Sequence, residues 1–260
     1  MNYFIEGLQG SGKSTLMQKL SERKSGCTPI REGEYSPVEL AWCAWTDEKT
    51  YEEILDKYAP IRALIEEKTY AEGDRRIICY TKIRTDIPGF YQDLERHEIY
   101  NGRTPFASFR DILLRRYGAW NGDGQIFECS LFQNTIEDMI LFRCFGDAQI
   151  LDFYRRVREA LDGKDYKIVY LKTTDIKANL DRIRKERSDA EGKELWFPLM
   201  LGFFDGSPYA KEKGVSGEEA LIEHFRLRQE LEMRICEEIF PDRSVILPSK
   251  GYTPQDLDAL

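Results

Sequence analysis

The feature that most constrains this chain is a loop near its start that matches the pattern G-x-x-x-x-G-K-[ST] at every fixed position. The loop and the residue after it read Gly7-Leu8-Gln9-Gly10-Ser11-Gly12-Lys13-Ser14-Thr15. An apolar segment at residues 3–5 precedes the loop and a helical pattern follows it, which is the strand–loop–helix context of a Walker A motif. The alternative is a glycine-rich turn that binds nothing. The full match favours a loop that binds a nucleoside triphosphate.

Each residue type in this loop has a physical role in holding phosphate. Glycines let successive backbone N–H groups turn inward without a Cβ clash, and the following helix directs the positive end of its dipole to the same point. Lys13 is expected to reach the β- and γ-phosphates, and the Ser14 hydroxyl is expected to bind Mg²⁺. We therefore predict that residues 7–15 form the nucleotide site, with Ser14 as a magnesium ligand.

The charge and the cysteine content of the chain indicate which kinds of binding partner and which cellular compartment to expect. A formal net charge of −8 and a pI near 5.1 argue against a general nucleic-acid or anionic-membrane surface, because phosphate backbones require clustered Lys and Arg. The six cysteines form no C-x-x-C pair, so reduced thiols in a cytoplasmic protein are expected. No apolar run approaches membrane-spanning length, and because the first predicted strand begins at residue 2 we expect no signal peptide.

Strand-like and helical patterns alternate along the chain. Five apolar segments read as core strands, at residues 2–6, 27–31, 125–129, 167–171 and 244–247. Such alternation predicts right-handed βαβ crossovers and a parallel sheet covered on both faces, in one three-layer α/β domain over residues 1–260. The stretch 33–123 is far longer than a simple crossover, so we predict a mostly helical insertion there. It is expected over the carboxyl ends of the strands, as the acceptor-binding region.

Several features of the predicted insertion can be interpreted in more than one way. Residues 36–39 read Ser-Pro-Val-Glu, a capping box with proline at the first helical position, and predict the start of a helix. Residues 75–83 look like a strand of either the core sheet or the insertion. Side chains that would suit a flat or anionic acceptor are Tyr35, Trp42, Trp45, Tyr80, Arg110, Arg115 and Arg116. The alternative is that the aromatic residues are core and the arginines a solvated face.

Three carboxylates stand where phosphoryl transfer would need them. Glu128 ends a predicted core strand, where it would hold Mg²⁺ or orient an acceptor hydroxyl; the alternative is a cap on the next helix. Glu32 and Glu34 follow the second strand, and either would accept a proton from the acceptor. Glu34 is preferred because it directly precedes the predicted helix, and a solvated turn is the alternative for both.

A strongly basic helical segment follows the fourth strand. Residues 181–188 read Asp-Arg-Ile-Arg-Lys-Glu-Arg-Ser, and their arginines would neutralise the charge that spreads over a transferring phosphoryl group. We therefore predict an arginine lid and its following loop over residues 175–215. The alternative is a charged helix face whose arginines pair with nearby acidic residues.

Four segments carry a resemblance to known kinases. Residues 6–15 are similar to the phosphate loop of thymidylate kinases, and residues 127–130 resemble the acidic-Arg-Ser motif of deoxynucleoside kinases, with Cys129 in place of the arginine. Residues 169–171 and 180–183 look like the strand and arginine-bearing lid helix of both groups.

This resemblance implies a P-loop NTPase fold with a five-stranded parallel sheet in the order 2-3-1-4-5. It also implies ATP and Mg²⁺ as ligands. By the same resemblance Lys13 holds the phosphates, Ser14 and Glu128 serve the metal or acceptor, and Arg182 and Arg187 close the lid.

The catalytic residues predicted for this chain are Lys13, Glu34, Glu128, Arg182 and Arg187. The leading hypothesis is a small-molecule kinase that moves the γ-phosphate of ATP to a hydroxyl or phosphate, with a nucleoside or nucleotide among the candidate acceptors. The alternative is a regulatory or switch ATPase without such an acceptor. Neither histidine has a partner at metal or triad spacing. The oligomeric state stays open, a homodimer included.

Overall fold

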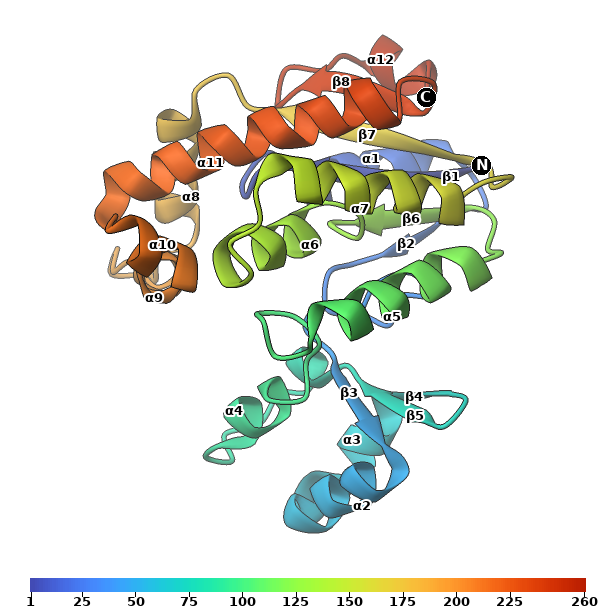
Figure 1. The fold of residues 1–260 in the computed structure, drawn as a ribbon, viewed down its shortest axis with the longest axis vertical. Coiled ribbons are helices and arrows are strands. Elements are labelled where there is room, and N and C mark those ends of the chain that lie inside the picture. Colours follow the sequence, from blue (N-terminus) through green and yellow to red (C-terminus); the bar gives the residue numbers. More distant parts are fainter. The chain divides into compact units, whose positions relative to one another are not determined.

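The computed structural model describes residues 1–260, which form two compact units. Unit 1 comprises Met1–Pro29 and Asn121–Leu260, and unit 2 comprises Ile30–Trp120. Each unit has its own sheet, with five strands in the first and three in the second (Figure 1). No helix in the chain is both long and apolar enough to cross a membrane.

Unit 1 is built on a parallel sheet whose order confirms the predicted fold class. The strands are β1 (Asn2–Gly7), β2 (Thr28–Ile30), β6 (Gln125–Glu128), β7 (Tyr166–Lys172) and β8 (Ser244–Pro248). They lie in the order β2-β6-β1-β7-β8, which is 2-3-1-4-5 when the five strands are numbered along the chain. β1 pairs in parallel with β6 and β7, and β7 pairs in parallel with β8. This is the strand order of a P-loop NTPase fold.

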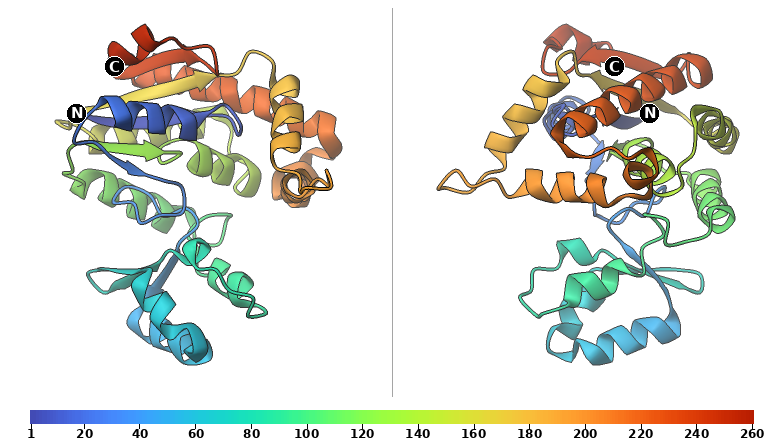
Figure 2. Two further views of the ribbon diagram at one scale, coloured as in Figure 1. Left: turned by 180° about the vertical axis from the view of Figure 1, so that it is seen from behind. Right: turned by 60° about the vertical axis from the view of Figure 1, so that its left-hand side comes forward.

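Alternating side chains of the central strands pack against helices on both faces of the sheet. Tyr3 and Ile5 of β1 belong to a buried cluster with residues of α1 (Lys13–Arg23) and α12 (Pro254–Asp258). Phe4 points to the other face and stacks on Phe127 of β6, with ring centroids 4.9 Å apart. Helices α7 and α11 cover that second face, while α1 lies behind the sheet (Figures 1 and 2). Because every residue of β1 is buried, the loop that follows it begins from a rigid position.

The remaining helices of unit 1 follow β6 and β7. They are α6 (Gln133–Glu137), the π-helix Asp138–Phe142, α7 (Asp147–Ala160), α8 (Ile176–Glu186), α9 (Trp196–Gly206), α10 (Pro208–Lys213), α11 (Gly217–Arg234) and the π-helix Ile235–Ile239. Residues of α8, α9, α10 and α11 share one buried apolar cluster, to which Leu8 of the phosphate loop also contributes. The segment predicted as a lid is therefore two packed helices, α8 and α9, followed by α10, rather than one helix and a loop.

Unit 2 contains a small antiparallel sheet as well as helices. The strands β3 (Ala44–Asp47), β4 (Thr69–Glu72) and β5 (Arg75–Ile78) lie in the order β3-β5-β4. Its helices are α2 (Glu48–Lys57), α3 (Arg62–Glu67), α4 (Phe90–Glu95) and α5 (Phe106–Ala119), with short 3₁₀ turns at Ala59–Ile61 and Tyr80–Lys82. The segment whose assignment was open, residues 75–83, is thus the middle strand of this small sheet and a turn, and it does not join the parallel sheet.

The helix predicted to begin at residues 36–39 does not form. The Ser36 hydroxyl accepts from the backbone N–H groups of Val38 and Glu39, as a capping residue does. The Glu39 carboxylate, however, is buried and accepts from the N–H of Ala41 rather than closing back on Ser36. Trp42 then adopts a left-handed conformation with φ of 64°, which a helix cannot accommodate.

Candidate nucleotide-binding site

The phosphate loop between β1 and α1 needs glycine at three positions, the two fixed ones of the pattern and Gly10. Gly7, Gly10 and Gly12 have φ values of 136°, 76° and 95°, a region that other residues rarely adopt. A Cβ on Gly10 would lie 2.6 Å from the Cδ1 atom of Ile183 in α8, and one on Gly7 would lie 2.7 Å from a backbone oxygen of β7. The positive φ therefore explains all three glycines, and close packing is a second reason for glycine at positions 7 and 10.

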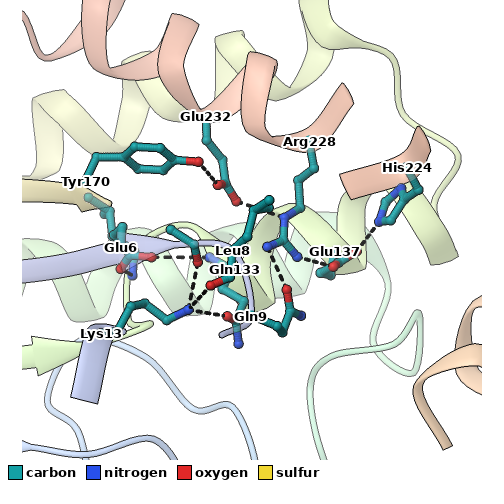
Figure 3. A network of polar contacts seen from close by, with 12 residues as sticks. Glu6, Leu8, Gln9, Lys13, Gln133, Glu137, Tyr170, His224, Arg228 and Glu232 are labelled. Carbon is teal, nitrogen blue, oxygen red and sulfur yellow. Dashed lines mark hydrogen bonds and ion pairs between the residues drawn. The ribbon is translucent and has the colours of Figure 1, made fainter. Parts of the chain in front are cut away.

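Lys13 is the first residue of α1 and is only 7% exposed. Its ammonium group donates to the backbone oxygens of Gly7 and Leu8, at 2.7 and 2.8 Å, and to the Oε1 atom of Gln133 at 3.0 Å (Figure 3). The positive charge is therefore held against the loop by the loop's own carbonyl groups. This arrangement keeps the charge beside the glycines that would surround a phosphate.

The structure brings together the two predicted magnesium ligands. The hydroxyl of Ser14, an exposed residue, donates to the Oε1 atom of Glu128. Glu128 is the last residue of β6 and lies opposite Ile5 in the pairing of β6 with β1, so the sheet register fixes its position beside the loop. A hydroxyl and a carboxylate are hard oxygen donors of the kind that Mg²⁺ prefers, so the pair fits that metal.

Helix α8 packs directly on the phosphate loop. The Asn179 side chain donates to the backbone oxygen of Gln9 at 2.8 Å, and Ile183 lies against Gly10. Arg182 is exposed on this helix. Arg184, in contrast, forms ion pairs with Glu194 and Glu218. Because its charge is already paired, we assign Arg184 a structural role.

Arg187 follows the last residue of α8 and is exposed. Its guanidinium lies over the ring of Trp196 in α9, 5.0 Å from the ring centroid. This is the distance of a cation–π contact, and it holds the arginine at the α8–α9 end of unit 1. Of the two predicted lid arginines, Arg182 lies on the helix that touches the loop, whereas Arg187 stacks on the next helix.

A lysine that the sequence patterns did not single out also lies at the loop. Ser249, just after β8, donates to the backbone oxygen of Ser11 at 2.8 Å, and the side chain of Lys250 lies against Gly12. Partial burial, together with the like charge of Arg182, lowers the pKa of Lys250. The sequence signal was its place directly after the last parallel strand, at the edge where ligands of such sheets bind.

A buried charged network extends from the loop into α11, and no sequence pattern indicated it. Arg228 is 0% exposed and donates to the Oε1 atom of Gln9 at 2.8 Å (Figure 3). The same guanidinium forms ion pairs with Glu137 and Glu232. His224, for which no role was expected, lies with Nε2 2.7 Å from the Oε2 atom of Glu137.

The network shifts the acidity of its carboxyl groups in opposite directions. Burial alone would raise the pKa of Glu137, but the charges of Arg228 and His224 outweigh it and lower the pKa to about 2. Glu6, which is fully buried, accepts from the N–H of Leu131 at 2.7 Å. Its burial outweighs that hydrogen bond and raises the pKa to about 8. Glu137 is therefore charged at neutral pH, whereas Glu6 is protonated in most molecules.

The candidates in unit 2 are engaged with their own surroundings. Glu34 accepts from the N–H of Arg31 at 2.9 Å, and Glu32 accepts from the Trp42 indole at 2.9 Å. A role for Glu34 in the reaction stays a prediction. The Tyr80 hydroxyl is buried and donates to Glu98, and the buried Arg116 pairs with Glu72, so both are core residues.

No protein-family profile matches this chain, but it is similar in part to a curated protein and over most of its length to a solved structure. A curated gasdermin, bGSDM, from a Desulfuromonadales bacterium is 34% identical over 77 residues. That match covers 30% of this chain and 28% of the gasdermin, so the chain spans little more than a quarter of this relative. A solved gluconokinase from Sinorhizobium meliloti 1021 matches 98% of this chain and 86% of its own, at 12% identity and a TM-score of 0.35. A score this low carries no functional argument.

Proposed function

We propose that this chain is an ATP-dependent small-molecule kinase, which transfers the γ-phosphate to a hydroxyl or phosphate group of an acceptor. The observation that carries the proposal is the contact of Ser14 with Glu128 directly beside Lys13, in a loop whose glycines have positive φ. Phosphoryl transfer depends on positioned phosphates and on charges that neutralise the transferring group. The loop, the lysine and the oxygen pair supply these elements.

Each residue has a definite part in this proposal. Lys13 would exchange its contacts with the loop carbonyls for the phosphate oxygens and neutralise their charge. Ser14 and Glu128 would hold Mg²⁺, which supplies further neutralisation of the phosphates. Arg182, exposed on the helix that touches the loop, and Lys250, beside Gly12, would add positive charge near the transferring group. Arg187 is proposed to join them when the lid helices close.

The test is ATP consumption with and without acceptors. The full chain would be mixed with Mg²⁺, ATP and a panel of nucleosides, nucleotides, sugars and aminoglycosides, and ADP release would be measured. We expect turnover that depends on one class of acceptor, with a phosphorylated product detected by mass spectrometry. Hydrolysis at the same rate without any acceptor would contradict the kinase and support the ATPase alternative, and no ADP release would contradict both.

Two variants make this test specific to the loop. Lys13→Ala should abolish ADP release, because it removes the positive charge held at the loop. Lys211→Ala removes an exposed lysine of α10 and should leave turnover unchanged. Equal turnover in both variants would mean that a contaminating enzyme or another site consumes the ATP.

A further inference from the structure

Two cysteines of unit 2 face each other across the small sheet. Cys43 directly precedes β3 and Cys79 directly follows β5. The pairing of Ala44 with Ile78 places these cysteines opposite each other when the register is continued by one residue. Their Sγ atoms lie 3.6 Å apart, and the N–H of Cys79 donates to the backbone oxygen of Lys68, which extends the β5–β4 ladder to this position.

This geometry is close to that of a disulfide. Directly opposite residues of antiparallel strands have Cα atoms roughly 4.5 to 5.5 Å apart, which falls within the range that disulfides span. The sulfur atoms would have to approach to about 2.05 Å, and this needs side-chain rotation with little movement of the strands. The two thiols are only 1% and 2% exposed, so no competing thiol can easily reach either one first.

The two thiols also differ in acidity, which assigns them different parts in an oxidation. The hydrogen bond with Cys43 and the nearby charge of Lys82 lower the pKa of Cys79. The hydrogen bond with Cys79, together with burial, raises the pKa of Cys43. Because the thiolate is the reactive form, Cys79 is the nucleophile and Cys43 the resolving thiol.

We propose that Cys43 and Cys79 form an oxidation site that closes to a disulfide with peroxide. The Cys79 thiolate attacks one oxygen of hydrogen peroxide, the O–O bond breaks, and Cys79 sulfenic acid and hydroxide form. The Cys43 sulfur then attacks the Cys79 sulfur, and its proton leaves with the sulfenic oxygen as water. In total two thiols lose two electrons and two protons, and one peroxide is reduced to two waters.

The consequence of this bond is confined to unit 2. It would join the segment that enters β3 to the segment that leaves β5, at the end of the sheet where Trp42 turns the chain. Oxidation should therefore raise the resistance of unit 2 to unfolding. Reduction by a thiol while the chain is unfolded, followed by refolding, should reverse the effect.

The first test counts thiols in the full chain. The native protein would be treated with equimolar hydrogen peroxide, denatured with an alkylating reagent, and weighed by intact-mass spectrometry. We expect four alkylated cysteines in place of six, a proteolytic peptide pair that joins Cys43 to Cys79, and recovery of all six with dithiothreitol. Six alkylated cysteines after treatment, or a bond between other cysteines, would overturn the proposal.

Single variants then distinguish the nucleophile from the resolving thiol. After peroxide treatment and unfolding in the presence of dimedone, Cys43→Ser should carry the label on Cys79, whereas Cys79→Ser should leave Cys43 unlabelled and unoxidised. Cys236→Ser removes another buried cysteine, outside this unit, and should retain the loss of two thiols. If Cys43→Ser still loses two thiols to a disulfide, the assignment of the pair is wrong.

Discussion

Replacement of Arg228 by methionine should strongly destabilise unit 1. The guanidinium is completely buried and connects three segments, through Gln9 in the phosphate loop, Glu137 in α6 and Glu232 in α11. Methionine keeps the unbranched apolar stem but lacks the guanidinium and its charge. The variant therefore leaves Glu137 and Glu232 without their buried cation.

The expected loss of unfolding free energy follows from the pKa of Glu137. The fall of its pKa from 4.5 to about 2 corresponds to roughly 3 kcal/mol, since one pKa unit equals about 1.4 kcal/mol. Arg228 and His224 share this stabilisation, and removal of one partner from a buried pair typically costs about 3–5 kcal/mol. We therefore expect Arg228→Met to lower the free energy of unfolding by about 3 kcal/mol at pH 7.

The stabilisation by the charged Glu137 depends on pH in a definite direction. The pKa of Glu137 is lowered in the folded chain, so the stabilisation is present above pH 4.5 and is lost as the pH falls towards 2. The difference between the wild type and Arg228→Met should therefore shrink as the pH falls through this range. Urea unfolding followed by circular dichroism at pH 7 and at pH 3 measures both quantities.

Arg226→Met is the matched control on the same helix. Arg226 forms ion pairs with Glu223 and Glu230 but its side chain is 46% exposed, and exposed pairs contribute at most about 1 kcal/mol. If Arg228→Met loses no more stability than Arg226→Met, or loses the same amount at both pH values, the buried ion pair of Arg228 with Glu137 does not stabilise unit 1.

Three other predictions concern the loop and the buried carboxyls. Lys13→Ala should abolish turnover and nucleotide binding while the circular dichroism spectrum stays that of the wild type, because the side chain contributes charge rather than core packing; normal turnover would show that the loop has no role. Glu128→Gln should lower kcat more than nucleotide affinity, as expected of a group that acts in the transition state, whereas equal losses in steady-state rate and in Kd would indicate a structural cap. Burial raises the pKa of Glu6 and of Glu39 to about 8, so both bind protons more tightly in the folded chain, and stability should fall as the pH rises from 4.5 towards 8. A urea midpoint at pH 8.5 equal to or above that at pH 5.5 would contradict this, and Glu6→Gln should reduce the difference.

The sequence was sufficient for those parts of the site whose positions follow from local pattern and strand order. The loop over residues 7–14 carries its own signature, and Glu128 could be placed beside it because it ends a strand of the same parallel sheet. The order of the sheet strands followed from the resemblance and is the order observed. Residues 36–39 show the limit of local pattern. They carry a capping signal, but no helix begins there because Glu39 is buried and accepts from the N–H of Ala41.

The parts that the sequence did not predict depend on contacts between distant segments. Arg228 is 219 positions from Gln9, and His224 is 87 positions from Glu137. On a helical pattern alone, a charged residue in the middle of α11 reads as part of a solvated face. Only the packing of α11 against the sheet shows that these charges are buried and paired. Lys250 was missed for a related reason, because its contact with Gly12 depends on the turn after β8.

Direct titration of the full chain with ATP in the presence of Mg²⁺ measures whether the phosphate loop binds a nucleotide. Isothermal calorimetry should show saturable uptake of one nucleotide per chain by the wild type, and this uptake should be lost in Lys13→Ala and retained in Lys211→Ala. Absence of uptake by the wild type, or equal affinity in the wild type and Lys13→Ala, would contradict the claim that this loop binds a triphosphate.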